Sequence, residues 1–221
     1  MKYILSILLS ALVCCSYGQT IPADVTLSDF VKETQQSKSE VGSNIKMAWW
    51  IPLEFWDIVA NSNPGISKSS MDQVKELFRG YTMVITIDGI NNGTPGSYNF
   101  RSYEDDKSIV TLVDSLNRRY IPLEDNELDN TALLFREKLK PVLTNMLGSM
   151  GSGANLYFFQ AREGMNTNTA SAKGRFKVML GNIPFKWSMP LACLMPDKYC
   201  PVDDLKMKGD WLFCPYHGVK L

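Results

Sequence analysis

The residues best suited to chemistry lie at the C-terminal end of the sequence. Two short motifs of the form Cys-Pro-x-(Asp or His) occur there, Cys200-Pro201-Val202-Asp203 and Cys214-Pro215-Tyr216-His217. Thiolate, carboxylate and imidazole groups all bind metal ions, and two ligands three residues apart point the same way from a tight turn. His217 is the only histidine, so a mechanism with two imidazoles is excluded and a catalytic triad would have to use this residue.

The second motif resembles the second knuckle of the zinc-ribbon family, with His217 where the last cysteine normally stands. The first motif resembles the first knuckle, with Asp203 in place of its second cysteine. Residues 204–213 between them suit a β-hairpin that brings the knuckles together. The resemblance implies a zinc ion held by Cys200, Asp203, Cys214 and His217, and four protein ligands close the coordination shell, so the metal would be structural.

A disulfide is the main alternative for the same cysteines. Three cysteines, Cys193, Cys200 and Cys214, remain once an export signal is removed, and an oxidising compartment favours a Cys200–Cys214 bridge across the hairpin. A knuckle with neither metal nor bridge is the third alternative. The sequence leaves these three open.

The first 18 residues have the pattern of a secretory signal peptide. Lys2 is followed by the apolar stretch 4–13 and by the small-x-small sequence Ser16-Tyr17-Gly18, which predicts cleavage after Gly18. The protein is therefore expected to be secreted or periplasmic. Large residues precede Cys14 and Cys15, which argues against a lipid anchor there.

The net charge and the length of the apolar stretches limit the kinds of partner that the protein is expected to have. Removing residues 1–18 takes away one lysine and no acid, so 22 basic residues face 23 acidic ones, and this balance gives no reason to expect nucleic acid. The apolar stretch 4–13 is shorter than the roughly 20 residues that span a bilayer, and no later stretch reaches that length. We expect no membrane span and a protein or glycan ligand of unknown identity.

Apolar periodicity predicts an α+β fold. Helical spacing and capping residues predict helices, and β-branched or alternating stretches between turns predict strands, of which the three at 98–123 are expected to form an antiparallel meander. The economical architecture is one domain, 19–196, with helices packed on one face of an antiparallel sheet, followed by a zinc-ribbon-like hairpin at 197–221. The expected helices cover 26–36, 52–63, 67–81 and 129–147, and the expected strands cover 45–51, 82–88, 98–101, 108–113, 119–123, 154–161 and 174–180.

Trp49, Trp50 and Trp56 form the most aromatic stretch of the chain. Their neighbours recur at helical spacing, which favours core packing over a platform that stacks sugars. The carboxylate pairs Glu54/Asp57 and Asp105/Asp106 could in principle serve a glycosidase.

Two functions are compatible with these features. The first is a secreted, non-enzymatic binding or envelope-associated protein whose C-terminus is closed by a structural metal or a disulfide. The alternative is a secreted hydrolase that acts on glycans through carboxylates beside a tryptophan-rich groove. Burial of the tryptophans separates the two.

Overall fold

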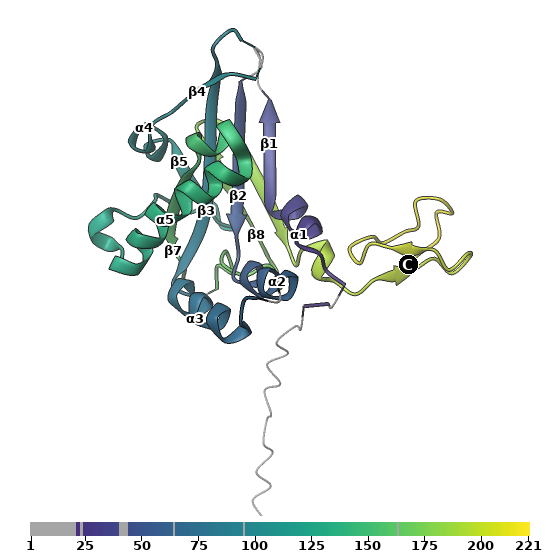
Figure 1. The fold of residues 1–221 in the computed structure, drawn as a ribbon. Helices are drawn as coiled ribbons and strands as arrows, with labels where there is room; N and C mark the ends of the chain where they lie inside the picture. Colours follow the sequence, from purple (N-terminus) through teal and green to yellow (C-terminus); the bar gives the residue numbers. More distant parts are fainter. Residues whose placement is uncertain (1–20, 23, 40–43, 64, 95, 163) are drawn as a thin grey trace, which may run out of the picture.

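The computed structural model describes residues 21–22, 24–39, 44–63, 65–94, 96–162 and 164–221 (Figure 1). The expected signal peptide at 1–18 and its cleavage after Gly18 lie outside these residues. No helix among the described residues has both the length and the apolar character needed to cross a bilayer.

A five-stranded antiparallel sheet lies at the centre of the fold. β1 (Gln35–Ser39) pairs with β2 (Ile45–Ile51), which pairs with the long strand β3 (Tyr81–Asn91). The far edge of β3 is shared by two shorter strands, β7 (Asn155–Gln160) along residues 81–86 and β4 (Tyr98–Phe100) along residues 89–91. β2 and β3 are therefore paired on both sides.

Three helices cover one face of this sheet: α2 (Glu54–Ser62), α3 (Lys68–Phe78) and α5 (Asn130–Leu147) (Figure 1). Successive strand residues point to opposite faces, and the alternate positions Met47, Trp49 and Ile51 of β2 pack under these helices. The same cluster takes alternate residues of β3 and β7, among them Ile85 and Phe158.

A second antiparallel sheet covers the opposite face. Its strand order is β6 (Arg119–Tyr120), β5 (Val110–Val113), β8 (Gly174–Leu180), β9 (Ile183–Met189). Trp50, Val84 and Tyr157 of the central sheet pack against Val178 and Trp187 of this second sheet. The fold thus has three layers, helices, sheet and sheet.

Short elements complete the chain. Thr26 caps α1 by accepting a hydrogen bond from the Asp29 N–H (3.1 Å), as the sequence predicted. The remaining elements are α1 (Leu27–Thr34), α4 (Tyr103–Lys107), β10 (Lys198–Tyr199), β11 (Lys206–Met207) and the 3₁₀ helices η1 (Asp125–Glu127), η2 (Gly148–Gly153) and η3 (Ala192–Leu194).

The α+β class is confirmed, with helices on one face of an antiparallel sheet. The meander at 98–123 was wrong in its first strand, because β4 pairs with β3, whereas β5 and β6 are antiparallel neighbours as expected and belong to the second sheet. β1 and β9 were not predicted as strands. Helix α3 begins after its cap Ser67, close to the start of the helix expected at 67–81.

Asp106 is an acid buried between the layers. Its side chain has no exposed area, Oδ2 accepts a hydrogen bond from the Thr86 hydroxyl (2.5 Å), and Oδ1 has no partner among the described residues. Burial raises the pKa of Asp106, and the nearby Asp88 adds to the rise, whereas hydrogen bonds from Thr86 and Asn155 and the charge of Lys46 oppose it.

We predict that Asp106 makes the folded protein less stable as pH rises. A carboxyl group whose folded pKa is raised stabilises the fold fully below its unfolded pKa, and that contribution is lost as pH rises through the folded pKa. Asp106→Asn should remove this loss of stability with rising pH, because the amide does not ionise. Urea unfolding across the weakly acidic to neutral range measures it, and Asp105→Asn, which changes an exposed carboxylate, is the control. Equal slopes of stability against pH in the native protein and Asp106→Asn would contradict the prediction.

Candidate metal centre

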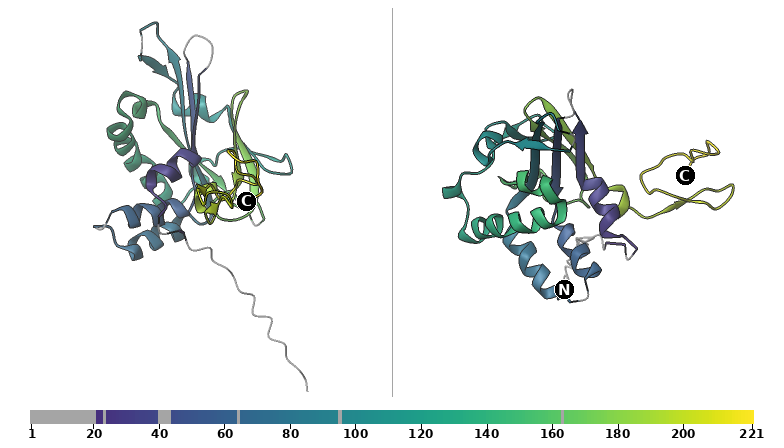
Figure 2. Two further views of the ribbon diagram at one scale, coloured as in Figure 1. Left: turned by 90° about the vertical axis from the view of Figure 1, so that its right-hand side faces the viewer. Right: turned by 45° about the horizontal axis from the view of Figure 1, so that its top comes forward.

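Residues 197–221, which we call the ribbon, stand out from the side of the three-layer body (Figure 1 and the right-hand view of Figure 2). Its one two-stranded ladder joins β10 to β11, with Lys198 opposite Met207. An isolated bridge pairs Phe213 with Lys220. The expected division of the chain at residue 197 remains a prediction.

The two Cys-Pro motifs fold into the same turn. In each, the cysteine N–H bonds to the carbonyl five residues ahead, and its carbonyl accepts from the N–H four residues ahead. The bonds are Cys200 N to Leu205 O (3.0 Å), Asp204 N to Cys200 O (2.8 Å), Cys214 N to Val219 O (2.8 Å) and Gly218 N to Cys214 O (2.8 Å). The motifs are thus paired knuckles in the backbone as well as in the sequence.

The equivalent positions Asp204 and Gly218 both have positive φ, 58° and 65°. Glycine adopts this left-handed conformation without strain, and Asp is one of the few other residues that tolerates it. The residue after each second ligand therefore ends the turn and fixes the direction in which the ligands point.

The knuckles bring three of the four predicted ligands together. His217 Nδ1 lies 3.3 Å from Cys200 Sγ and 3.6 Å from Cys214 Sγ, and the three ligand atoms lie within 4.8 Å of one another. Tetrahedral zinc, with Zn–S near 2.3 Å and Zn–N near 2.05 Å, separates its sulfur and nitrogen ligands by about 3.5 Å. The cluster could therefore hold a metal ion.

Asp203 lies beside this cluster rather than within it. Its Oδ2 is 4.0 Å from His217 Nδ1, and its Oδ1 accepts a hydrogen bond from the Leu205 N–H (3.2 Å). That N–H and the Cys200 thiol lower the pKa of Asp203, so the carboxylate is ionised at neutral pH. A tetrahedral ion would place the oxygen and nitrogen ligands about 3.4 Å apart, so Asp203 would have to move closer to the cluster to become the fourth ligand.

Burial and nearby backbone N–H groups act in opposite directions on the pKa values of the two knuckle thiols. Burial raises the pKa of the Cys200 thiol, while the N–H groups of Val202 and Asp203 act against the rise. Burial acts in the same direction at Cys214, but the N–H groups of His217 and Tyr216 outweigh it and lower the pKa of that thiol. These donors solvate a thiolate, which is the protonation state that binds metal.

Cys193 is separate from the cluster. It is a half-buried thiol in η3, its N–H donates to Glu33 Oε1 (3.1 Å), and burial raises its pKa to about 12. All three described cysteines are free thiols, and two of them contact His217.

A small apolar cluster packs around the two knuckle cysteines. Met207 is buried with them, and Trp211, Val219 and Leu221 are partly buried against them. The Lys198 ammonium group donates to the Trp211 carbonyl (2.7 Å). These backbone and packing contacts, which the motif spacing did not reveal, hold the knuckles in position.

The ribbon is held to the body at its base. The Lys206 ammonium group lies 3.1 Å from Asp24 of the body, and it also forms an ion pair within the ribbon, 2.7 Å from Asp197. A Cβ on Gly209 would come within 2.5 Å of the Met195 side chain and 2.6 Å of the Pro196 carbonyl, so only glycine allows this close approach.

The tryptophan-rich stretch forms no open groove. Trp49 and Trp50 lie on opposite faces of β2, with exposures of 4% and 0%. Trp56 is partly buried, stacked on Phe78 and edge-on to Phe135. The three rings therefore belong to the core, as the sequence favoured.

The candidate acid pair Glu54/Asp57 has structural partners. Glu54 accepts hydrogen bonds from Thr169, Ala170 and Ser171 of the 161–173 loop. Asp57 forms an ion pair with Lys75 (2.6 Å). The carboxylates beside the tryptophans therefore hold a loop and a neighbouring helix in place.

Comparison of the chain with protein-family models, with curated proteins and with solved structures finds no match.

We predict that Gly218→Ala loosens the ribbon. A Cβ at this position meets nothing within 4 Å, so the cost comes from the positive φ alone, about 1 kcal/mol, or a fivefold faster amide exchange of the ribbon. NMR hydrogen exchange of the Cys214 amide measures the change. The matched variant is Asp204→Gly, which relieves strain at the equivalent position and should not speed exchange. Similar acceleration by both variants would contradict the equivalence of the knuckles.

Proposed function

We propose that this chain is an exported, non-enzymatic binding protein whose ribbon is closed by a structural zinc ion and presents an apolar surface to a partner protein. The observation that carries the proposal is the pair of equivalent knuckles, with ligands turned inward and apolar side chains turned outward. Export itself is inferred from the sequence of residues 1–18.

The donor set favours zinc as the metal. Two thiolates and one imidazole match the sulfur and nitrogen ligands of structural zinc sites, and a carboxylate oxygen is an accepted fourth ligand. His217 contacts both sulfurs through Nδ1, a position that a metal explains and a Cys200–Cys214 disulfide does not use. With Asp203 as the fourth ligand, the coordination shell is closed and no site remains for a reacting water.

The ribbon exposes several large apolar side chains among its charged residues. Tyr199 and Phe213 precede the two cysteines, and Val202 and Tyr216 occupy the x position of the two motifs, so they form equivalent pairs. All four, with Leu205 and Leu212, are 47–71% exposed. Such a concentration of exposed apolar side chains in one short segment is typical of an interaction surface.

Charge favours a protein as the partner. Residues 197–221 contain four lysines and four aspartates, so the ribbon has no excess positive charge to attract anionic lipid or nucleic acid. Aromatic side chains surrounded by balanced charges are the usual composition of a protein–protein contact.

We predict one zinc ion per chain in the mature protein. Cys200→Ser and Cys214→Ser should each lower zinc affinity by about 100-fold or more, because a ligand is lost. Native mass spectrometry with a chelator competition measures this. Cys193→Ser is the matched control and should retain the ion.

The same zinc-affinity measurement tests the role of Asp203 with two matched variants. Asp203→Asn should weaken zinc binding, whereas Asp204→Asn, at a position whose positive φ Asn also tolerates, should not. A mature protein that lacks two hydrogens and binds no metal would establish the disulfide instead and refute the zinc site.

We predict that a photo-crosslinking residue at Tyr216 captures a discrete protein in the producing cells. The same residue at Leu116, an equally exposed position on the body, is the control and should not capture it. Cys214→Ser should abolish the adduct, because the knuckle then loses its shape. The captured protein is identified by mass spectrometry of the crosslinked peptide, and its binding is repeated with the two purified proteins.

Two outcomes would refute the apolar surface as a protein contact. One is equal labelling from positions 116 and 216. The other is adducts at 216 that contain only lipid or glycan. The zinc measurement is independent of both.

A further inference from the structure

The outer edge of β7 carries backbone groups that have no hydrogen-bond partner among the described residues. Ala161 N–H bonds to Gly80 O on the β3 side (2.9 Å), and Leu123 N–H bonds to Phe158 O on the other side (2.8 Å). Because backbone groups alternate between the two edges of an antiparallel strand, the N–H and C=O of Leu156 face outward. No described residue bonds to them, although Leu156 is buried.

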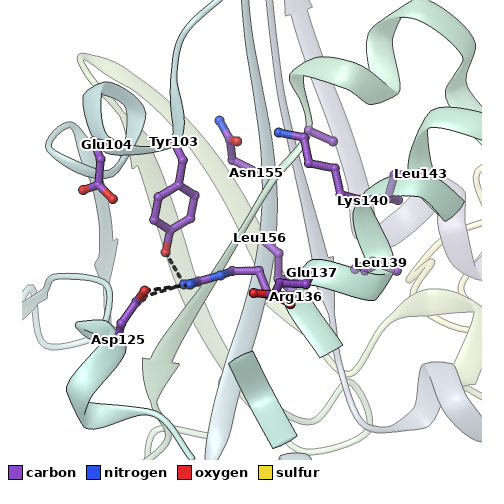
Figure 3. A pocket seen from close by; sticks show the side chains of 11 residues that line it. Tyr103, Glu104, Asp125, Arg136, Glu137, Leu139, Lys140, Leu143, Asn155 and Leu156 are labelled. Carbon is purple, nitrogen blue, oxygen red and sulfur yellow. Dashed lines mark hydrogen bonds and ion pairs between the residues drawn. The ribbon is translucent and has the colours of Figure 1, made fainter. Parts of the chain in front are cut away.

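A pocket of about 380 Å³ lies at this edge. It is bounded by α5 on one side and by α4 on the other, with β7 between them (Figure 3). Leu143 of α5, Ala154 and Leu156 give it an apolar lining, and the Tyr103 ring forms a wall. The volume is in the range of pockets that bind small ligands.

The two cationic residues of the pocket differ in their state. Arg136 forms a two-bond ion pair with Asp125 (2.9 Å each) and donates to the Tyr103 hydroxyl (2.8 Å), so its charge is already matched. Lys140 also lines the pocket and is exposed, and it makes no ion pair within the described chain. One positive charge is therefore available to a ligand.

We propose that this pocket binds an extended peptide, which adds as a strand to β7 at Leu156, places an apolar side chain over Leu143 and directs a carboxylate toward Lys140. A donor and an acceptor on one strand residue match the backbone of another extended chain, and pockets beside a strand edge give such binding its side-chain preference. Buried backbone groups without partners are costly, so the bound peptide satisfies both.

The acidic residues at the rim restrict the ligand class further. Glu104 and Glu137 line the pocket along with Lys140, and their negative charge disfavours a polyanion such as nucleic acid. A peptide with one carboxylate can pair with Lys140 and, unlike a polyanion, brings no further negative charge near Glu104 and Glu137. This site is separate from the ribbon and does not depend on its metal.

The test uses the peptide Leu-Thr-Leu-Thr-Leu with a free carboxylate, and two doubly N-methylated derivatives of it that are isomers of each other. One isomer is N-methylated on its threonines and the other on its second and third leucines. Alternate N–H groups of an extended peptide point to opposite edges, so strand addition requires one set only. One isomer should bind like the parent and the other about tenfold more weakly, and amide exchange at Leu156 should slow when the parent peptide binds.

Two variants test the carboxylate contact. Lys140→Ala should remove an approximately threefold preference for the free acid over the C-terminal amide. Lys138→Ala changes an exposed lysine outside the pocket of the same helix and should keep the preference. Equal binding of both N-methyl isomers, unchanged exchange at Leu156 in the complex, or no binding of the parent peptide would each overturn the proposal.

Discussion

The fold depends on the burial of β2 and β3 on both faces. Trp50 and Val84 have no exposed area on the side of the second sheet, and Ile85 and Ile87 are equally enclosed beneath the helices. A strand pair that is apolar on both sides cannot sit at a surface, because each face must be removed from water. The helices are therefore needed to cover one face of the strand pair, and the second sheet is needed to cover the other.

This requirement also explains the positions of the polar groups inside the body. Trp50 donates its indole N–H to the Thr167 carbonyl (2.7 Å). Glu54 accepts hydrogen bonds from the backbone of Ala170 and Ser171 in the same loop. Buried donors and charges are tolerated where they have partners. The polar loop 161–173 thus closes one end of the layers, and Glu54 is part of that closure rather than of a catalytic pair.

Local features were predictable from the sequence, and distant pairings were not. The cap at Thr26, the strand at 45–51 and the start of α5 after Asp129 depend on neighbouring residues, and the structure has them there. β1 has the polar sequence Gln-Gln-Ser-Lys-Ser and is a strand because it pairs with β2, so no local signal exists. The outward positions of Leu134 and Val142 on α5 likewise depend on which face meets the sheet.

The ribbon follows a different physical rule from the body. Its apolar cluster contains Met207, Trp211, Val219 and Leu221 around two cysteines, while the aromatic side chains of Phe213 and Tyr216 face water. So small a cluster supplies little burial energy, and domains of this size usually depend on a metal or a disulfide. A cross-link at the cysteines frees the aromatic residues from stabilising the fold, which is the condition under which they can remain exposed for a partner. The motif spacing predicted where a cross-link could form, but only the fold shows which side chains lie outside it.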